Sequence, residues 1–273
     1  MNCLDDVHHA LYINLDSRND RREHVETQLA GLKNGMMRNL KPERFNAIKN
    51  ANGAVGCSMS HLRCIKLAQE RNWDHVLVCE DDVLFTNVPL FLTQLSKFLA
   101  TVPDWDVVLL AGNNIPPFHV VNDACIKVRN CQTTTAYIVK QHYYDTLIDN
   151  YREGIHQLMR APTQRINYAI DRFWFELQRR DQWFLITPLS VVQREDYSDI
   201  EERVTNYSHL MLDIDKEALI RRMTESNHNH NSIITPRQQP VKHIQPTQKS
   251  QSVHSQNATN QFNIQCIRMQ LKK

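Results

Sequence analysis

The sequence of 273 residues has only six glycines, and it contains neither a G-x-G-x-x-G fingerprint nor a P-loop. Both motifs need glycines that let backbone amides approach phosphates, so their absence counts against a dinucleotide dehydrogenase or a P-loop ATPase. No stretch approaches the ~18–20 apolar residues of a membrane span. The seven cysteines form no Cys-x-x-Cys pair, which argues against a zinc ribbon or a disulfide framework and leaves pairing of Cys125 with Cys131 open.

Acidic residues are missing from residues 226–273, which hold six Lys or Arg, nine Gln and six Asn. Such a segment buries too little apolar surface to offset its ordering entropy. We therefore predict a folded domain at residues 1–225 followed by a polar, basic, disordered tail. The chain carries a net charge of +2 and the tail +6, so the domain carries −4. The tail's sparse charge and single aromatic residue, Phe262, argue against nucleic-acid binding.

The first nine residues contain Asp5 and Asp6 and no apolar run, unlike a secretory signal. With no transmembrane segment expected either, the sequence favours a cytoplasmic location. Peripheral association with a membrane is left open.

Short apolar runs alternate with amphipathic segments through the first 190 residues. This alternation predicts an α/β fold with a mostly parallel central sheet and helices on both faces. Ligands of such sheets bind at the carboxyl ends of the strands. The expected strands are residues 10–15, 45–48, 75–79, 83–85, 106–111, 133–139 and 183–186, the expected helices are 18–32, 56–71, 88–100, 141–151 and 166–180, and 188–199 is expected to be irregular and functional.

Three consecutive carboxylates, Glu80, Asp81 and Asp82, follow the apolar strand at 75–79. Like charges this close raise one another's pKa unless a cation is present. Carboxylate oxygens suit Mg²⁺ or Mn²⁺, ions that also bridge phosphate oxygens. The triplet thus predicts a metal site, with a solvated acidic turn as the alternative.

Three arginines, Arg18, Arg21 and Arg22, follow the first predicted strand. Arginine forks suit phosphate groups, and a metal with arginines is the combination that a nucleotide diphosphate needs. The alternative is an exposed helix face. The sequence alone does not establish that the first strand and the strand before the triplet are neighbours.

Three segments in series resemble glycosyltransferase family 25, which includes lipooligosaccharide and procollagen galactosyltransferases. The segment from Asn14 to Glu23 resembles its opening motif, Gly53 to His61 its second motif, and Val76 to Phe85 its acidic, DXD-like motif. Weaker matches continue through 105–106, 112, 135–137, 171 and 197–200. The sequence departs from the family at Ala54, where Glu is usual, and in the short stretch between residues 34 and 52.

The resemblance implies a GT-A type nucleotide-sugar-binding fold and inverting transfer from a UDP-sugar, usually galactose, with Mn²⁺ or Mg²⁺. It implies a role in lipopolysaccharide or glycoprotein biosynthesis. The acceptor is then a glycan, a lipid-linked saccharide or a protein hydroxyl. Carried onto this chain, the metal ligands are Asp82 and Glu80, and the nucleotide-binding residues are Asn14, Arg18, Arg21, Arg22, Glu80, Asp81, Thr135 and Tyr137.

An inverting transferase needs a general base for the acceptor hydroxyl. Asp171 is our first candidate, because Trp174 and Phe175 follow it at helical spacing and a dry, aromatic environment raises a carboxyl pKa. Asp199 and Glu195 are the reserves, and a capping role for Asp171 is the alternative. His61 is interpreted as a core histidine. A non-catalytic relative acting as a binding or adhesion module is the alternative function.

Overall fold

The computed structural model describes residues 1–198, 200–217 and 221, and Met1–Asp215 forms one compact unit. The predicted tail at 226–273, its boundary with the domain and the reserve candidate Asp199 lie outside the described residues. Within the described residues, no helix is long and apolar enough to cross a membrane.

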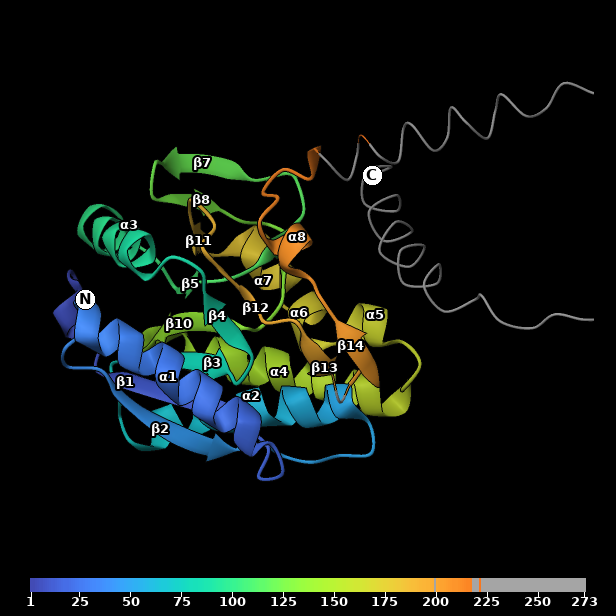
Figure 1. Ribbon diagram of the computed structural model, residues 1–273. Coiled ribbons are helices and arrows are strands. Elements are labelled where there is room, and N and C mark those ends of the chain that lie inside the picture. The colour runs from blue at the N-terminus through green and yellow to red at the C-terminus, as the bar shows by residue number, and fades with distance from the viewer. Residues whose placement is uncertain (199, 218–220, 222–273) are drawn as a thin grey trace, which may run out of the picture. The chain divides into compact units, whose positions relative to one another are not determined.

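Helices occupy most of the segments where amphipathic spacing predicts them (Figure 1). The α2 helix begins after Asn52, whose side chain caps its first turn by accepting from two backbone amides. The α-helices are α1 Asn19–Gly35, α2 Gly53–Glu70, α3 Val88–Thr101, α4 Tyr144–Arg160, α5 Arg165–Tyr168, α6 Ile170–Phe173, α7 Phe175–Arg180 and α8 Ser208–Met211, and the 3₁₀ helices are Leu4–Asp6 and Gln141–Tyr143.

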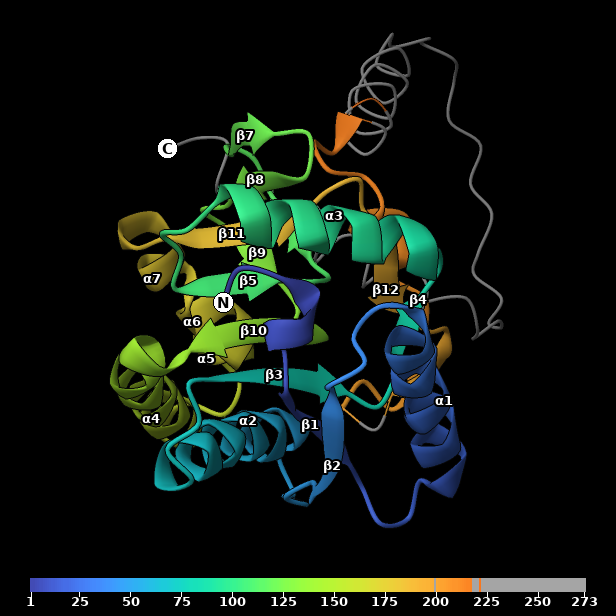
Figure 2. The ribbon, with the colours of Figure 1, turned by 90° about the vertical axis from the view of Figure 1, so that its left-hand side faces the viewer.

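Eight strands form the central sheet in the order β2-β1-β3-β10-β5-β11-β8-β7, stacked from bottom to top in Figure 2. The pairings leave β10 and β8 antiparallel to the other six strands. The eight strands of the central sheet are β1 His9–Asn14, β2 Lys41–Asn46, β3 His75–Glu80, β5 Val107–Leu109, β7 His119–Asn122, β8 Cys125–Lys127, β10 Ala136–Lys140 and β11 Trp183–Ile186. Three small sheets contain β4 Val83–Phe85, β6 Asn113–Asn114, β9 Cys131–Gln132, β12 Val191–Gln193, β13 Asp196–Ser198 and β14 Arg203–Thr205.

Alternate residues of the buried strands feed two hydrophobic layers, one on each face of the sheet. One layer packs the strands against α1 and α3 and includes Tyr12 and Leu77. The other packs them against α2, α4, α6 and α7 and includes Leu11 and Val78. The predicted α/β class, with a mostly parallel central sheet and helices on both faces, is therefore confirmed.

One predicted helix is wrong. The segment expected as a single helix at 166–180 is broken into α5, α6 and α7. The break between the first two lies at Ala169, whose ψ of 145° leaves the helical region. The second break lies at Trp174, which is fully buried and donates its indole N–H to the carbonyl of Cys131. Tertiary packing of this side chain outweighs the local periodicity.

Other differences concern short strands and one cysteine. The β7–β8 edge pair was not predicted, and the segment expected to be irregular contains β12 and β13. Cys125 is a free, buried thiol, so the open question of a Cys125–Cys131 disulfide is answered in the negative.

Candidate functional site

The carboxyl ends of β1 and β3 bring the predicted site residues together. The two strands are parallel neighbours, with Ile13 opposite Glu80, so Asn14 and Asp81 lie side by side at the same edge of the sheet. The adjacency that the sequence left open is thereby established. Next to β3, the antiparallel β10 begins at this edge, and Glu80 donates its backbone N–H to the carbonyl of Thr135.

Asp81 is held at both of its carboxylate oxygens. Its Oδ2 accepts from Asn14 Nδ2 at 2.8 Å, and its Oδ1 accepts from Arg21 Nη1 at 3.0 Å. Asn14 is itself fixed by Arg44, which donates to the Asn14 side-chain oxygen at 3.0 Å. Burial raises the pKa of Asp81 in spite of these donors. Both of its oxygens are occupied, so its role is to lock β1, α1 and β3 together.

Asp82 has the oxygen that lacks a partner. Its Oδ1 is buried and makes no hydrogen bond, while its Oδ2 lies 3.6 Å from Arg21 Nη1. Burial, reinforced by the negative charge of Glu80, raises the pKa of Asp82 to about 8. An unpaired buried carboxylate oxygen is unfavourable unless a cation neutralises it. Asp82 therefore fits a hard divalent ion, as its position in the acidic motif leads us to expect.

Glu80 is surrounded by hydrogen-bond donors. Its Oε1 accepts from His61 Nε2 at 3.1 Å and from the Thr134 hydroxyl at 2.5 Å, and its Oε2 accepts from Gln193 Nε2 at 3.4 Å. Burial raises the pKa of Glu80, but the contacts with His61 and Thr134 outweigh burial and hold this pKa below its ordinary value. Glu80 therefore stays ionised while its neighbour Asp82 retains a proton when no metal is bound.

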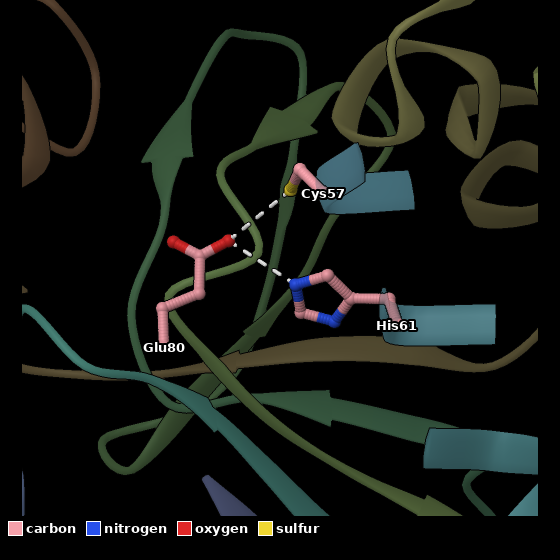
Figure 3. Close-up of side chains that lie close together, drawn as sticks. All are labelled: Cys57, His61 and Glu80. Carbon is pink, nitrogen blue, oxygen red and sulfur yellow. Dashed lines mark hydrogen bonds and ion pairs between the residues drawn. The ribbon is translucent and has the colours of Figure 1, made fainter. Parts of the chain in front are cut away.

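A thiol completes the surroundings of Glu80. Cys57 and His61 lie one turn apart on α2 and point toward the carboxylate, as Figure 3 shows. The Cys57 Sγ lies 3.8 Å from Glu80 Oε1, and the three ligand-type atoms all lie within 4.8 Å of one another. On the same helix, Gly56 lets α2 pack closely against the segment at Ile48, because an added Cβ would meet the Ile48 carbonyl oxygen at 2.6 Å.

The predicted residues Thr135 and Tyr137 lie behind this cluster. Both are fully buried. The Tyr137 hydroxyl lies 3.0 Å from His61 Nδ1 and accepts from Tyr151 at 3.3 Å. Thr135 contacts Glu80 through its backbone carbonyl, and Tyr137 contacts His61 through its hydroxyl. His61 is buried as expected of a core histidine, but it also contacts the acidic motif directly.

The three arginines separate into two groups. Arg18 and Arg21 turn toward the site, where both bind Oδ2 of Asp196 at 3.2 Å. Arg22 turns outward and pairs with Glu26 on the surface of α1 at 3.0 Å. Of the three residues predicted to approach the nucleotide, the structure therefore brings only Arg18 and Arg21 to the acidic residues.

Asp196, at the start of β13, was missed by the sequence reasoning. Besides the contacts with Arg18 and Arg21, it accepts from Arg194 Nη2 at 2.5 Å. Burial opposes its ionisation, yet these donors hold the pKa of Asp196 well below its ordinary value. The Arg194 backbone N–H donates to the carbonyl of Asp82 at 2.7 Å, which ties this segment to the acidic motif. The dense charge of residues 194–196 was the only available sequence signal.

The three candidate bases differ in their surroundings. Asp171, on α6, accepts from the Thr133 backbone N–H at 3.2 Å, and burial raises the pKa of Asp171, with the charge of Glu80 contributing. The expected rise is thus present, although the broken helix removes the spacing argument behind it. Glu195 is exposed and accepts from Asn206 Nδ2 at 2.6 Å. Asp199 is outside the described residues.

Solved structures with some similarity include mannose-1-phosphate geranyltransferase from Thermus thermophilus, with 8% identity over 66% of this chain and 73% of that chain and a TM-score of 0.40. Drosophila β-1,4-galactosyltransferase 7 in complex with manganese, UDP-Gal and xylobiose has 13% identity over 80% of this chain and 79% of that chain, with a TM-score of 0.37. A glycosyltransferase that glycosylates the major capsid of PBCV-1 has 11% identity over 67% and 94%, with a TM-score of 0.37. Similarities this low carry no argument about function.

No curated protein sequence matches the chain. The family model of glycosyltransferase family 25, described as an LPS biosynthesis protein, matches residues 51–156. This range contains α2 with Cys57 and His61, the acidic residues after β3, and β10 with Tyr137. Residues 51–156, at the centre of the site, therefore match glycosyltransferase family 25, and this match supports a glycosyltransferase.

Proposed function

We propose that this glycosyltransferase moves a hexose, galactose ahead of glucose, from a UDP-sugar to a hydroxyl acceptor with inversion. The proposed reaction depends on Mn²⁺ or Mg²⁺. The observation that carries the proposal is the unpaired, buried Oδ1 of Asp82, next to an arginine fork at the carboxyl end of β3. A saccharide acceptor agrees with the family description as an LPS biosynthesis protein.

Asp82 and Glu80 are the proposed metal ligands. Asp82 offers its free oxygen, and Glu80 offers Oε2, whose single protein donor is the distant amide of Gln193 at 3.4 Å. When bound, the ion neutralises charge on the departing diphosphate. The charge of Arg21, whose side chain is only 11% exposed, would supplement it from the α1 side.

Arg18 and Arg21 are the proposed diphosphate ligands from the protein. In the absence of donor both bind the Asp196 carboxylate, with the Tyr197 carbonyl as a second acceptor. A diphosphate presents the same kind of negatively charged oxygen acceptors. We therefore expect donor binding to compete with Asp196 for these two guanidinium groups.

Asp171 is the proposed general base. Transfer forms a bond between the acceptor oxygen and the sugar C1, breaks the bond from C1 to the diphosphate oxygen, and sends the hydroxyl proton to the base. The raised pKa of Asp171 brings its proton affinity closer to what this transfer requires. The negative charge of Glu80 contributes to this rise, which is consistent with Asp171 lying near the same site as Glu80.

The test is calorimetric binding of UDP with Mn²⁺ and with EDTA. We expect binding that requires the metal, lost in Asp82→Asn and weakened at least about tenfold, or ~1.4 kcal/mol, in Arg21→Ala. Arg22→Ala is the matched control, because the adjacent arginine faces away and pairs with Glu26; its affinity should equal that of the wild type. Absence of UDP binding in both metal conditions would favour a non-catalytic binding module.

A further inference from the structure

Cys57, His61 and Glu80 form a cluster whose chemistry differs from that of the proposed donor-metal site. It combines a thiol sulfur, an imidazole nitrogen and a carboxylate oxygen, all within 4.8 Å of one another (Figure 3). His61 is fully buried, and the other two are partly buried. Mn²⁺ and Mg²⁺ favour oxygen ligands, whereas sulfur with nitrogen favours zinc and related ions.

The spacing of the three atoms already approaches that of a tetrahedral site. With bond lengths of ~2.3 Å to sulfur and ~2.1 Å to nitrogen and oxygen, tetrahedral ligands lie about 3.4 Å apart for N···O and about 3.6 Å apart for S···O. The observed separations are 3.1 Å from His61 Nε2 to Glu80 Oε1 and 3.8 Å from Cys57 Sγ to the same oxygen. These two separations are within a few tenths of an ångström of the tetrahedral values, and the separation of Cys57 Sγ from His61 Nε2 is within 4.8 Å.

The residues behind the cluster support a histidine ligand. Metal-bound histidines usually donate their second ring N–H to an oxygen, which fixes the tautomer and the ring orientation. Here His61 Nδ1 lies 3.0 Å from the Tyr137 hydroxyl oxygen, and Tyr151 in turn contacts Tyr137. The ring also stacks against Tyr137, with the centroids 5.7 Å apart. His61 is therefore already oriented with Nε2 toward the other two ligands.

We propose that Cys57, His61 and Glu80 form a second metal site, selective for zinc-like ions, with water as the fourth ligand. Binding replaces the Cys57 thiol proton, which leaves to solvent, and moves the ring proton of His61 to Nδ1. A hydrogen-bonded trio without metal affinity is the competing interpretation. The two differ in one observable property, a bond from Cys57 sulfur to a metal.

Zinc at this site would inhibit transfer, a consequence that rests on the proposed function. Glu80 belongs to both sites, so zinc bound at Oε1 removes charge that would otherwise serve the donor metal. Because Asp82 is not part of the second site, Asp82→Asn should abolish the response to Mn²⁺ and leave zinc binding intact. Failure of one site therefore does not imply failure of the other.

Cobalt titration of the full chain tests the proposal without using activity, because Co²⁺ bound by thiolate gives a sulfur-to-metal charge-transfer absorption. We expect this absorption to saturate at one equivalent and to disappear when Zn²⁺ is added. Cys57→Ser should abolish it. Cys64→Ser is the matched control, since Cys64 is a buried thiol on the same helix that is not part of the candidate metal group found among the described residues, and it should retain the absorption.

Zinc X-ray absorption of the wild-type protein provides a test that needs no variant to fold. The expected first shell contains one sulfur with nitrogen and oxygen ligands. A shell of nitrogen and oxygen alone would place zinc elsewhere, for example on histidines outside the described residues, and would overturn the proposal. Thiolate absorption that persists in Cys57→Ser would overturn it as well.

Discussion

Replacing Asp82 with Asn should abolish metal binding and yet stabilise the metal-free protein. The change keeps the shape of the side chain and removes its charge. In the metal-free protein Oδ1 is buried without a hydrogen bond, and the neighbouring Glu80 opposes ionisation of Asp82. Arg21 loses one weak contact at 3.6 Å but keeps its shorter contacts with Asp81 and Asp196.

The magnitude follows from the pKa. Asp82 has a pKa of about 8 in the folded protein against an ordinary value of 3.8, so folding takes up a proton between these pH values. The stability that this protonated carboxyl provides is fully present below the unfolded-state pKa and is lost as pH rises through about 8. The free energy of unfolding of the wild type then falls by up to ~1.4 kcal/mol per pH unit in this window. Asn does not titrate, so the advantage of the variant should grow by about 2 kcal/mol from pH 6 to pH 8.

Thermal unfolding in EDTA from pH 6 to pH 9 measures this difference. For a domain of this size ~2 kcal/mol corresponds to about 4–8 °C, which should accumulate toward pH 8 and then level off. Added Mn²⁺ should raise the midpoint of the wild type only. Asp149→Asn, at an exposed carboxylate of α4, is the control and should match the wild type at every pH. The reasoning would be refuted if Asp82→Asn were less stable than the wild type at pH 8, or if the difference in their unfolding midpoints were the same at every pH.

Three further predictions concern the fold that supports the site. Gly56→Ala should lower the free energy of unfolding by about 1–3 kcal/mol, because the new Cβ meets the Ile48 carbonyl at 2.6 Å. Gly31 lies on an open helix surface, so Gly31→Ala should raise the free energy of unfolding by ~0.5–1 kcal/mol; urea unfolding measures both. Tyr143→Phe should lower the free energy of unfolding by about 1–3 kcal/mol, since the Tyr143 hydroxyl donates to Asp181 and accepts from the Trp183 N–H. Tyr144→Phe should be neutral or stabilising, because the buried Tyr144 hydroxyl has no hydrogen-bond partner. Equal effects of the two variants in urea unfolding would contradict this. Burial lowers the pKa of His75 from 6.5 to about 4, so the stability that its neutral form provides is complete above pH 6.5 and is lost as pH falls toward 4. In His75→Gln the free energy of unfolding should therefore fall less steeply between pH 6.5 and pH 4. An unchanged slope in this range would contradict the prediction.

Local patterns predicted the parts of the site that are contiguous in sequence. The apolar run before Glu80 indicates a buried strand, and the strand's end determines where the triplet lies. The α1 segment is likewise marked by its apolar spacing. These signals act within one element, and the structure adds the lateral order of β1 and β3, which no local pattern encodes.

Long-range contacts were the part that sequence reasoning missed. Asp196 meets Arg18 across 178 positions of sequence, and nothing near either residue indicates the pairing. The break at Ala169 is similarly unmarked, because residues 163–187 contain neither Gly nor Pro. The partnerless oxygen of Asp82 depends on which donors the neighbouring segments supply, a property of the packed site and not of the motif.

The most direct test of the proposed donor site is release of UDP from a panel of UDP-sugars, with Mn²⁺ and with EDTA, by the wild type and by Asp82→Asn. We expect slow hydrolysis of one donor, UDP-galactose ahead of UDP-glucose, that requires the metal and is lost in the variant while the variant remains folded. Hydrolysis that proceeds equally well in EDTA, or in Asp82→Asn, would contradict a metal-assisted donor site at the end of β3.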